Sequence, residues 1–231
     1  MMTNMKKNIF FAMMLALVCF AMTSCGDKES EGRSRITYYA ILDLNGDAYI
    51  TTPIGSTFND PGCRATEGGE DVTDKIVVTG SVDTKKLGFY KLGYTVVNAD
   101  GFPASASRTV AVVDKNNFAS TYFGESQYGS RHFFNSPINI TDNGDGTYTI
   151  DDILGGFYCY GRYPSYLGVL DFFLDAVVKL NADNSIELVK YGEWYWGDDV
   201  PELLDGSYDP ATGTVALNMD FGAPFTVILT K

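Results

Sequence analysis

The chain has very few of the residues from which most catalytic and metal sites are built. Its 231 residues include one histidine, His132, and four cysteines. Serine-hydrolase triads and Cys-His nucleophiles need a histidine as general base, and zinc sites need several His or Cys ligands. We interpret His132, in the segment 130–134, as an ordinary strand or loop residue. The sequence therefore predicts no catalytic residue, no metal site and no cofactor.

Cysteine is also too scarce for a fold held together by disulfides. Cys19 and Cys25 belong to the N-terminal segment, which leaves Cys63 and Cys159 in two different predicted domains. Two such residues are typical of buried thiols that pack as small apolar side chains, and the core has to be built from hydrophobic burial. A single bridge between the domains is the alternative.

Positive charge is scarce as well. The chain carries 17 lysines and arginines against 29 aspartates and glutamates, a formal net charge of −12. Loss of residues 1–24 would remove Lys6 and Lys7 and no acid, which gives 15 minus 29, or −14. Such a surface repels phosphate backbones, so nucleic acid is not expected as a partner. We interpret the negative charge as a solubility device.

One apolar run, residues 9–22, is present near the N-terminus, and it is too short to span a bilayer comfortably. It follows Lys6 and Lys7 and ends just before the small residues Thr23 and Ser24 and then Cys25. This pattern predicts a lipoprotein signal peptide over residues 1–24, with Cys25 as the site of lipid attachment. A plain signal peptide or an uncleaved anchor helix is the alternative, and both also place the chain outside the cytoplasm.

Residues 25–35 are predicted to form an acidic tether that does not pack. The tether resembles the acidic export signal with which some gram-negative bacteria send lipoproteins to the outer face of the outer membrane. We therefore expect a protein held in outer-membrane lipid through acylated Cys25 and facing the cell exterior.

Long helical patterns are absent from the rest of the chain. Short runs rich in Val, Ile, Tyr, Thr and Phe recur between turn dipeptides such as Asn143-Gly144 and Asp205-Gly206, which predicts an all-β protein. We expect hairpins that pair 138–140 with 148–150, 176–180 with 185–189, and 206–208 with 214–217, and a last strand at 225–229.

The first half of the chain predicts a domain over residues 36–114. Its strands are expected at 36–42, 47–51, 76–82, 88–98 and 107–113, with one apolar face on the core. Several stretches resemble, in order, a bacterial immunoglobulin-like surface domain: Phe58-Asn59-Asp60-Pro61-Gly62-Cys63-Arg64-Ala65, Val82-Asp83-Thr84, Leu87-Gly88-Phe89-Tyr90, Tyr94-Thr95-Val96, Asp100-Gly101 and Arg108-Thr109-Val110-Ala111-Val112-Val113-Asp114. The resemblance implies an Ig-like β-sandwich that acts as a spacer or adhesion module. Two departures, the missing glycine in Glu70-Asp71-Val72-Thr73 and the presence of Cys63, affect a loop and a core position.

Residues 115–124 are expected to be a linker, and residues 125–231 a second all-β domain, an antiparallel sandwich or barrel-like sheet. The segments 155–161, 194–198 and 206–209, rich in glycine and aromatic residues, resemble the C-terminal domain of uncharacterised lipoproteins from starch-utilisation-type glycan uptake loci. The run 166–178 is ambiguous: Leu167, Leu170 and Leu174 would line a helix face, whereas Phe172, Leu174 and Ala176 would line a strand face. The asparagine-rich turn that follows favours the strand.

Two acidic patterns allow weaker interpretations. The segment 141–152 imitates a calcium loop, but Thr141 occupies the position where a carboxylate is needed. Asp151-Asp152 and Asp198-Asp199 are paired acids, yet neighbours on a strand point to opposite faces, so neither pair forms a glycosidase site by itself.

The aromatic residues give the best candidate site. Trp194 and Trp196 are the two tryptophans of the chain, they flank Tyr195, and they precede Asp198 and Asp199 on an expected strand end. Sugar rings stack on indole and phenol rings while carboxylates accept their hydroxyl hydrogen bonds. We expect a carbohydrate-binding site formed by Trp194, Trp196, Asp198, Asp199 and Tyr160; packing of these aromatics in the core is the alternative.

Together these features predict a non-catalytic, lipid-anchored surface protein that binds an oligosaccharide or polysaccharide beside a glycan-uptake transporter. Two other classes remain open: a structural or adhesion spacer without a small ligand, and a glycoside hydrolase or its accessory protein.

Overall fold

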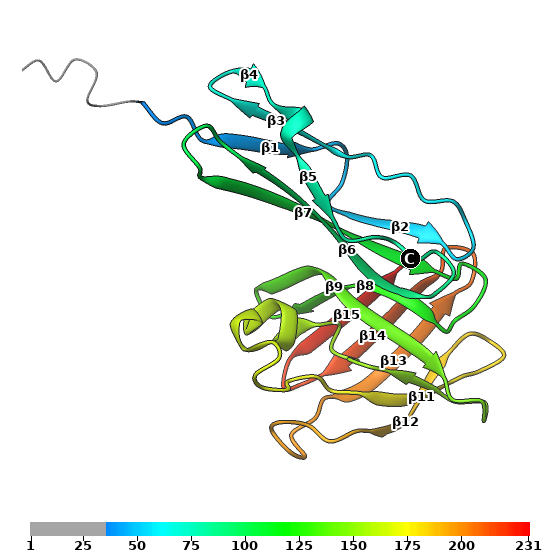
Figure 1. Cartoon of the computed structure of the whole chain (residues 1–231). Helices are drawn as coiled ribbons and strands as arrows, with labels where there is room; N and C mark the ends of the chain where they lie inside the picture. The colour runs from blue at the N-terminus through cyan, green and yellow to red at the C-terminus, as the bar shows by residue number, and fades with distance from the viewer. Residues whose placement is uncertain (1–35) are drawn as a thin grey trace, which may run out of the picture. The chain divides into compact units, whose positions relative to one another are not determined.

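The computed structural model describes residues 36–231. The predicted signal peptide 1–24, the lipid site Cys25 and the tether 25–35 lie outside the described residues. Within residues 36–231, no helix has the length and apolar character needed to cross a membrane. The predicted all-β fold class is confirmed, with an Ig-like domain followed by an eight-stranded antiparallel sheet that is nearly a barrel (Figure 1).

The Ig-like part consists of two sheets. One has the strand order β1-β3-β4 and the other the order β2-β7-β6-β5, in which β2 runs parallel to β7. Their bounds are β1 Ala40–Leu44, β2 Tyr49–Pro53, β3 Cys63–Glu67, β4 Glu70–Asp71, β5 Val77–Thr79, β6 Gly88–Val97 and β7 Pro103–Val113, with a short 3-10 helix η1 at Thr73–Lys75.

The core of this part follows from alternation along β6 and β7. Leu92, Tyr94 and Val96 on β6 are buried, and so is Val110 on β7, because alternate residues of a strand point to the same face. The long predicted strands correspond to β6 and β7. The short strand β3 was not predicted, since its buried residues Cys63 and Ala65 are small and its sequence has little β-branched character.

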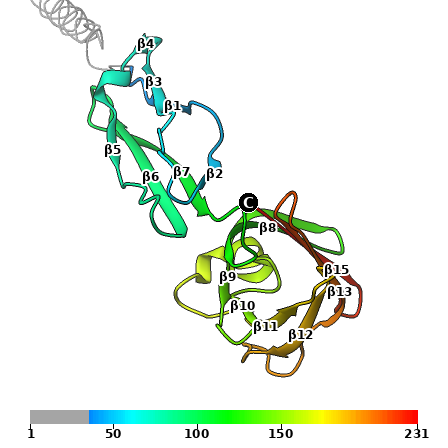
Figure 2. The same cartoon turned by 90° about the vertical axis from the view of Figure 1, so that its right-hand side faces the viewer.

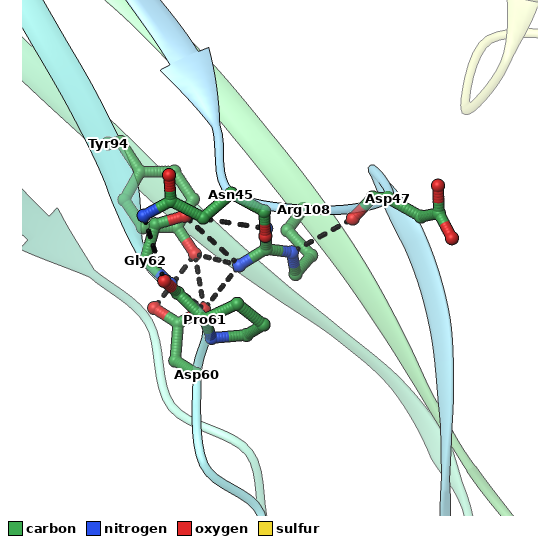
Figure 3. Close-up of polar contacts among 7 residues, drawn as sticks. All are labelled: Asn45, Asp47, Asp60, Pro61, Gly62, Tyr94 and Arg108. Carbon is green, nitrogen blue, oxygen red and sulfur yellow. Dashed lines mark hydrogen bonds and ion pairs between the residues drawn. The ribbon is translucent and has the colours of Figure 1, made fainter.

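A fully buried arginine, Arg108, joins two loops of the Ig-like part (Figure 3). Its guanidinium donates to the carbonyl oxygens of Asn45 at 2.7 Å and Asp47 at 3.0 Å, and it forms an ion pair with Asp60. The Tyr94 hydroxyl donates to the same Asp60 carboxylate at 2.7 and 2.8 Å. Partial burial by itself would raise the pKa of Asp60, but these donors and the Gly62 N–H outweigh it and hold the pKa below 3.8.

The second half of the chain forms one antiparallel sheet with the order β12-β11-β10-β9-β8-β15-β14-β13. The strands are β8 Ser120–Tyr128, β9 Arg131–Asp142, β10 Tyr148–Ile150, β11 Ala176–Leu180, β12 Ile186–Tyr191, β13 Glu202–Asp209, β14 Thr214–Asp220 and β15 Pro224–Thr230. The first half of β8 falls within the segment 115–124 that was expected to be a linker.

The two edge strands of this sheet, β12 and β13, meet and almost close the barrel (Figure 2). A single antiparallel bridge joins Ser185 to Ser207, and the Tyr208 N–H donates to the Asn184 carbonyl at 2.9 Å. Gly206 allows the close approach, since a Cβ there would lie 2.9 Å from the Ile186 Cβ. This contact covers part of the two strand edges that the sheet would otherwise expose.

The predicted hairpins of this half are confirmed. Asp142 pairs with Tyr148 and Ile140 with Ile150 across the Asn-Gly-Asp-Gly turn. Likewise β11 pairs with β12, Gly206 pairs with Leu217, and β15 spans the predicted last strand. Turn dipeptides with positive φ and alternating strands set these pairings locally, which is why the sequence was sufficient.

The chain between β10 and β11 fills the interior of the near-barrel. Ile153, Leu154 and Phe157 are buried there in one cluster with the inward-facing side chains of the sheet. A π-helix, η2 at Phe157–Arg162, and a 3-10 helix, η3 at Pro164–Tyr166, follow. The ambiguous run 166–178 is not a helix: Phe172, Leu174 and Ala176 are buried in strand-like alternation, although regular strand begins at Ala176.

Small residues of the sheet make room for this inner segment. A Cβ on Gly124 would lie 2.9 Å from the Gly155 carbonyl oxygen, and one on Gly156 would lie 2.2 Å from the Ser136 Cβ. Ser126 and Ser136 are buried, and their hydroxyls have no hydrogen-bond partner among the described residues. We conclude that Ser126 and Ser136 have to be small, because the main chain of the inner segment passes directly against them.

Candidate functional site

A pocket of about 330 Å³ lies where several turns of the near-barrel converge. Strand pairing places Tyr128 opposite Phe225, Tyr128 opposite Arg131, and Glu202 opposite Asp220, so these strand ends share one end of the sheet. The inner segment and the turn after β12 reach the same place. The pocket is lined by Tyr128, Arg131, Phe157, Tyr158, Arg162, Tyr163, Trp194, Trp196, Asp199 and Phe221.

Aromatic rings form most of the pocket wall. Trp196 is 38% exposed, and its ring lies 4.9 Å from Tyr158 and 6.5 Å from Tyr163, centre to centre. Tyr158 and Tyr163 are stacked 17° from parallel at 6.2 Å. One face of the Trp196 indole packs nearly parallel to Phe172 at 5.1 Å, which holds the ring in place.

Trp194 has a different role from Trp196. It is buried, and its indole N–H donates to the carbonyl oxygen of Phe172 at 3.1 Å. Its ring meets that of Trp196 edge-on at 4.9 Å. Trp194 therefore forms the floor of the pocket and anchors the turn that carries Trp196.

This turn corrects a prediction. The tryptophans and the two aspartates were expected at the end of a strand. They lie instead in a turn, in which the Gly197 N–H donates to the Trp194 carbonyl at 2.9 Å. Gly197 has φ of +67°, which favours glycine and ends any extended conformation. The buried contact of Trp194 with Phe172, distant in sequence, decides the conformation against the aromatic strand propensity.

Charged groups line the pocket beside the rings. The Arg162 guanidinium lies 5.2 Å from the centre of the Tyr163 ring, and its Nε donates to the Tyr163 hydroxyl at 2.8 Å. Arg131 comes from the start of β9, and Asp199 from the turn after Trp196. The site thus combines flat apolar rings with donors and one carboxylate acceptor.

A second hollow of about 620 Å³ adjoins the first and shares Tyr128, Asp199 and Phe221 with it. Its other lining residues include Glu202 and Asp220 and no arginine or lysine. The two arginines therefore belong to the first pocket alone, and the carboxylates concentrate on the side of the second.

A buried carboxylate, Asp152, holds the inner segment that presents the pocket tyrosines. It accepts hydrogen bonds from the backbone N–H groups of Leu154 and Gly156, both at 3.1 Å, and of Leu174 at 3.4 Å. Burial raises the pKa of Asp152 to about 7, and the three N–H donors limit the rise. Asp152 faces its own backbone, and its role is to position the segment.

In the segment 141–152, which imitates a calcium loop, the carboxylates also accept hydrogen bonds from nearby groups of the chain. Asp145 accepts hydrogen bonds from the backbone N–H and the hydroxyl of Thr147 at 3.0 and 2.6 Å, and Asp152 points into the interior. Among residues 36–231, no three His, Cys, Asp or Glu side chains gather in a way that could hold a metal ion. The turn therefore accounts for the pattern without metal.

The structure brings three of the five predicted sugar-contact residues together: Trp194, Trp196 and Asp199 line the pocket. Asp198 does not line it, and Tyr160 lies against Phe173 with ring centres 5.7 Å apart, where burial raises its pKa to about 12. Sequence reasoning missed Tyr128, Arg131, Arg162 and Phe221, because nothing in their local sequence indicates that distant turns converge here. For Tyr158 and Tyr163, the sequence does offer a signal, since both lie with Tyr160 and Tyr166 in a stretch of nine residues that is rich in tyrosine.

Fold and pocket define an all-β protein in which an Ig-like module precedes a larger domain that carries an aromatic pocket. A family model for the Ig-like domain of bacterial surface proteins matches residues 42–112, and a model for a C-terminal domain matches residues 113–231, about half of the chain. The lipoprotein BT2262 from Bacteroides thetaiotaomicron has a solved structure that is 30% identical, with 84% of this chain and 100% of that chain covered and a TM-score of 0.54. The chain belongs to the family of BT2262-like lipoproteins.

Other comparisons add little. The structure of CBM51-2 in complex with GlcNAc and INT domains, from ZmpB of Clostridium perfringens, is 16% identical, with a TM-score of 0.29, and covers 78% of this chain and 29% of that chain. A similarity that low carries no argument for this chain. No curated protein matches the sequence. The family assignment supports a surface or membrane-associated location.

Proposed function

We propose that this lipoprotein binds a glycan at the cell surface, without cleaving it, in the pocket lined by Trp196, Tyr158 and Tyr163. The observation that carries the proposal is the partly exposed indole of Trp196, held by Phe172 on one side and placed beside two tyrosine rings. Sugar rings stack on such flat surfaces. Arg131, Arg162 and Asp199 supply hydrogen-bond donors and an acceptor for hydroxyl groups at the same place.

Binding without catalysis is favoured by the placement of the carboxyl groups. A glycosidase needs one carboxylic acid with a raised pKa facing a second carboxylate across the sugar. Burial raises the pKa of both Asp151 and Asp152, but these two groups line neither hollow and are engaged by Asn139 and by backbone N–H groups. The carboxylates of the second hollow make hydrolysis the rival outcome that the experiment has to measure.

The proposal also includes the location of this pocket at the cell surface. The predicted acylation of Cys25 would hold the protein in the outer membrane with the pocket exposed to the cell exterior, where captured glycan is available to an uptake transporter. Support comes from the signal-peptide pattern and from the family of surface lipoproteins. Lipid attachment is tested by Cys25→Ser, which should release the protein from the membrane fraction.

The test of binding uses the purified full chain on a panel of neutral and acidic polysaccharides, by affinity electrophoresis and calorimetry. Trp196→Ala should weaken binding at least about tenfold, as expected for an aromatic residue at the centre of a contact. Tyr195→Ala is the matched control, since Tyr195 is 55% exposed, adjacent, aromatic and outside the pocket. Equal loss in both variants, or no binding to any glycan, would refute the proposal, and new reducing ends in the reaction would show hydrolysis instead.

A further inference from the structure

The described residues include four arginines, and their partners divide them into two pairs. Arg64 and Arg108 form ion pairs with Asp71 and Asp60. Arg131 and Arg162 have no carboxylate partner among residues 36–231, and both line the aromatic pocket. In a chain with 29 acidic residues against 17 basic ones, two arginines that line one pocket without forming an ion pair are unexpected.

The geometry of Arg162 leaves its recognition atoms available. Its Nε donates to the Tyr163 hydroxyl, and its guanidinium packs over the Tyr163 ring at 5.2 Å. Its two terminal nitrogens make no hydrogen bond within the described part of the chain. Stacking thus orients the planar group while the donors that fit a carboxylate or sulfate stay open.

We propose that the pocket selects an acidic glycan, one whose sugars carry a carboxylate or a sulfate, and that Arg131 and Arg162 bind this anionic group. The inference rests on the proposed function, because it concerns the same pocket. Trp196 and Tyr158 stack on the ring of the sugar, the arginines pair with its anionic substituent, and Asp199 accepts a hydroxyl hydrogen bond. The acidic lining of the adjoining hollow, with Glu202 and Asp220, repels the anion and fixes its orientation toward the arginines.

A membrane surface or a nucleic acid also presents anions, but the pocket favours a sugar. Its wall is made mostly of flat aromatic rings, and its volume of about 330 Å³ suits one or two sugar rings. The negative charge of the rest of the chain opposes approach to an extended anionic surface.

The experiment compares each acidic polysaccharide with its neutral counterpart. Polygalacturonate is tested beside its carboxyl-reduced form, and carrageenan beside its desulfated form, with the purified full chain. We expect one acidic member to bind, its neutral counterpart to bind at least about tenfold more weakly, and binding to weaken as salt shortens the screening length. The member that binds identifies carboxylate or sulfate as the recognised group.

Variants separate this inference from the proposed function. Arg131→Gln and Arg162→Gln should each weaken binding of the acidic glycan at least about tenfold, and Arg162→Lys should restore part of it, because charge returns without the planar fork. The control Lys85→Gln/Lys86→Gln removes two positive charges from the Ig-like part and should leave binding unchanged. The acidic specificity would be overturned if the neutral glycan bound equally well, if Trp196→Ala abolished this binding and if both arginine variants kept it. The proposed function would then still stand. No binding of any member would overturn both.

Discussion

At the scale of single residues, the Ig-like part depends on one buried cation. Arg108 has no exposed surface, and its donors hold the loops at Asn45 and Asp60 through carbonyl and carboxylate acceptors. A buried guanidinium is stable here because its Nε and both terminal nitrogens donate hydrogen bonds to oxygen acceptors. The ion pair and the two carbonyl hydrogen bonds therefore fix the arrangement of these two loops.

Replacing this arginine tests its structural role. Arg108→Met should lower the free energy of unfolding of the Ig-like part by about 1–3 kcal/mol, since the carbonyl oxygens of Asn45 and Asp47 would lose the donors that now hold them. Chemical denaturation followed by tyrosine fluorescence or circular dichroism measures the change. Arg64→Met is the matched control, because the Arg64–Asp71 ion pair is exposed to solvent and its loss should change the stability little. Equal effects of the two substitutions would contradict the role assigned to Arg108.

At the scale of elements, local sequence determined the hairpins and did not determine the inner segment. The pairing of Asp142 with Tyr148 follows from a turn of Asn-Gly and Asp-Gly pairs between alternating strands, and all of this information lies within a dozen residues. The π-helix at Phe157–Arg162 instead depends on Gly156 passing against Ser136, and on Leu174 donating to Asp152. Such contacts join residues 20 or more positions apart, so the hydrophobic periodicity of the local sequence cannot predict them.

The residues of the candidate site also divide into those that local sequence indicates and those that only the fold brings together. Trp194, Trp196 and Asp199 were found because an aromatic and acidic cluster stands out in the sequence. The arginines were missed, since Arg131 and Arg162 lie 31 positions apart in the sequence and reach the pocket from two different elements. Sequence reasoning located part of the pocket lining, and the fold supplied the rest.

The buried carboxyl of the inner segment gives the second half of the chain a defined pH dependence. Because the pKa of Asp152 is about 7 in the folded state and near 3.8 when unfolded, the folded state binds the proton more tightly. The contribution of Asp152 to stability is therefore greatest below pH 3.8 and falls as pH rises toward 7. Exposed acids such as Asp145 and Asp183, whose pKa is lowered by hydrogen bonds from neighbouring hydroxyls, act in the opposite direction and below pH 4.

Asp152→Asn should remove this dependence. Between about pH 4 and pH 7, the free energy of unfolding of the wild type should decline more steeply with pH than that of the variant. Urea denaturation at several pH values measures both slopes. The variant Asp198→Asn, altered at an exposed carboxyl, should keep the wild-type slope. Parallel slopes for wild type and Asp152→Asn would show that Asp152 does not titrate in this range.

At the scale of the whole described structure, the pocket exists because the eight-stranded sheet curls until its two edges meet. The inner segment is enclosed by this closure, and the segment in turn places Tyr158, Arg162 and Tyr163 at the rim. Closure rests on few contacts: the Ser185–Ser207 bridge, the hydrogen bond from the Tyr208 N–H, and the packing of Gly206 on β12. We therefore expect this seam to be the first part of the sheet to open.

Gly206→Val tests the seam. A Cβ at position 206 would lie 2.9 Å from the Ile186 Cβ and 3.1 Å from Leu217 Cδ2, so a valine has to push β12 away from β13. The expected cost is about 1–3 kcal/mol of unfolding free energy, as for overpacking in a dense core. Hydrogen exchange should show faster loss of protection at the Tyr208 N–H, which bonds to Asn184 across the seam.

The matched control is Ser207→Val, because Ser207 is exposed and a valine there enters no packed space. Its Tyr208 N–H should keep the wild-type protection. If Gly206→Val also keeps that protection, β12 and β13 do not depend on close approach at Gly206, and the sheet is held closed by its inner segment instead. If protection is lost at Tyr208 and glycan affinity falls with it, closure of the sheet and the shape of the pocket are coupled, because the same inner segment packs against the sheet and lines the pocket.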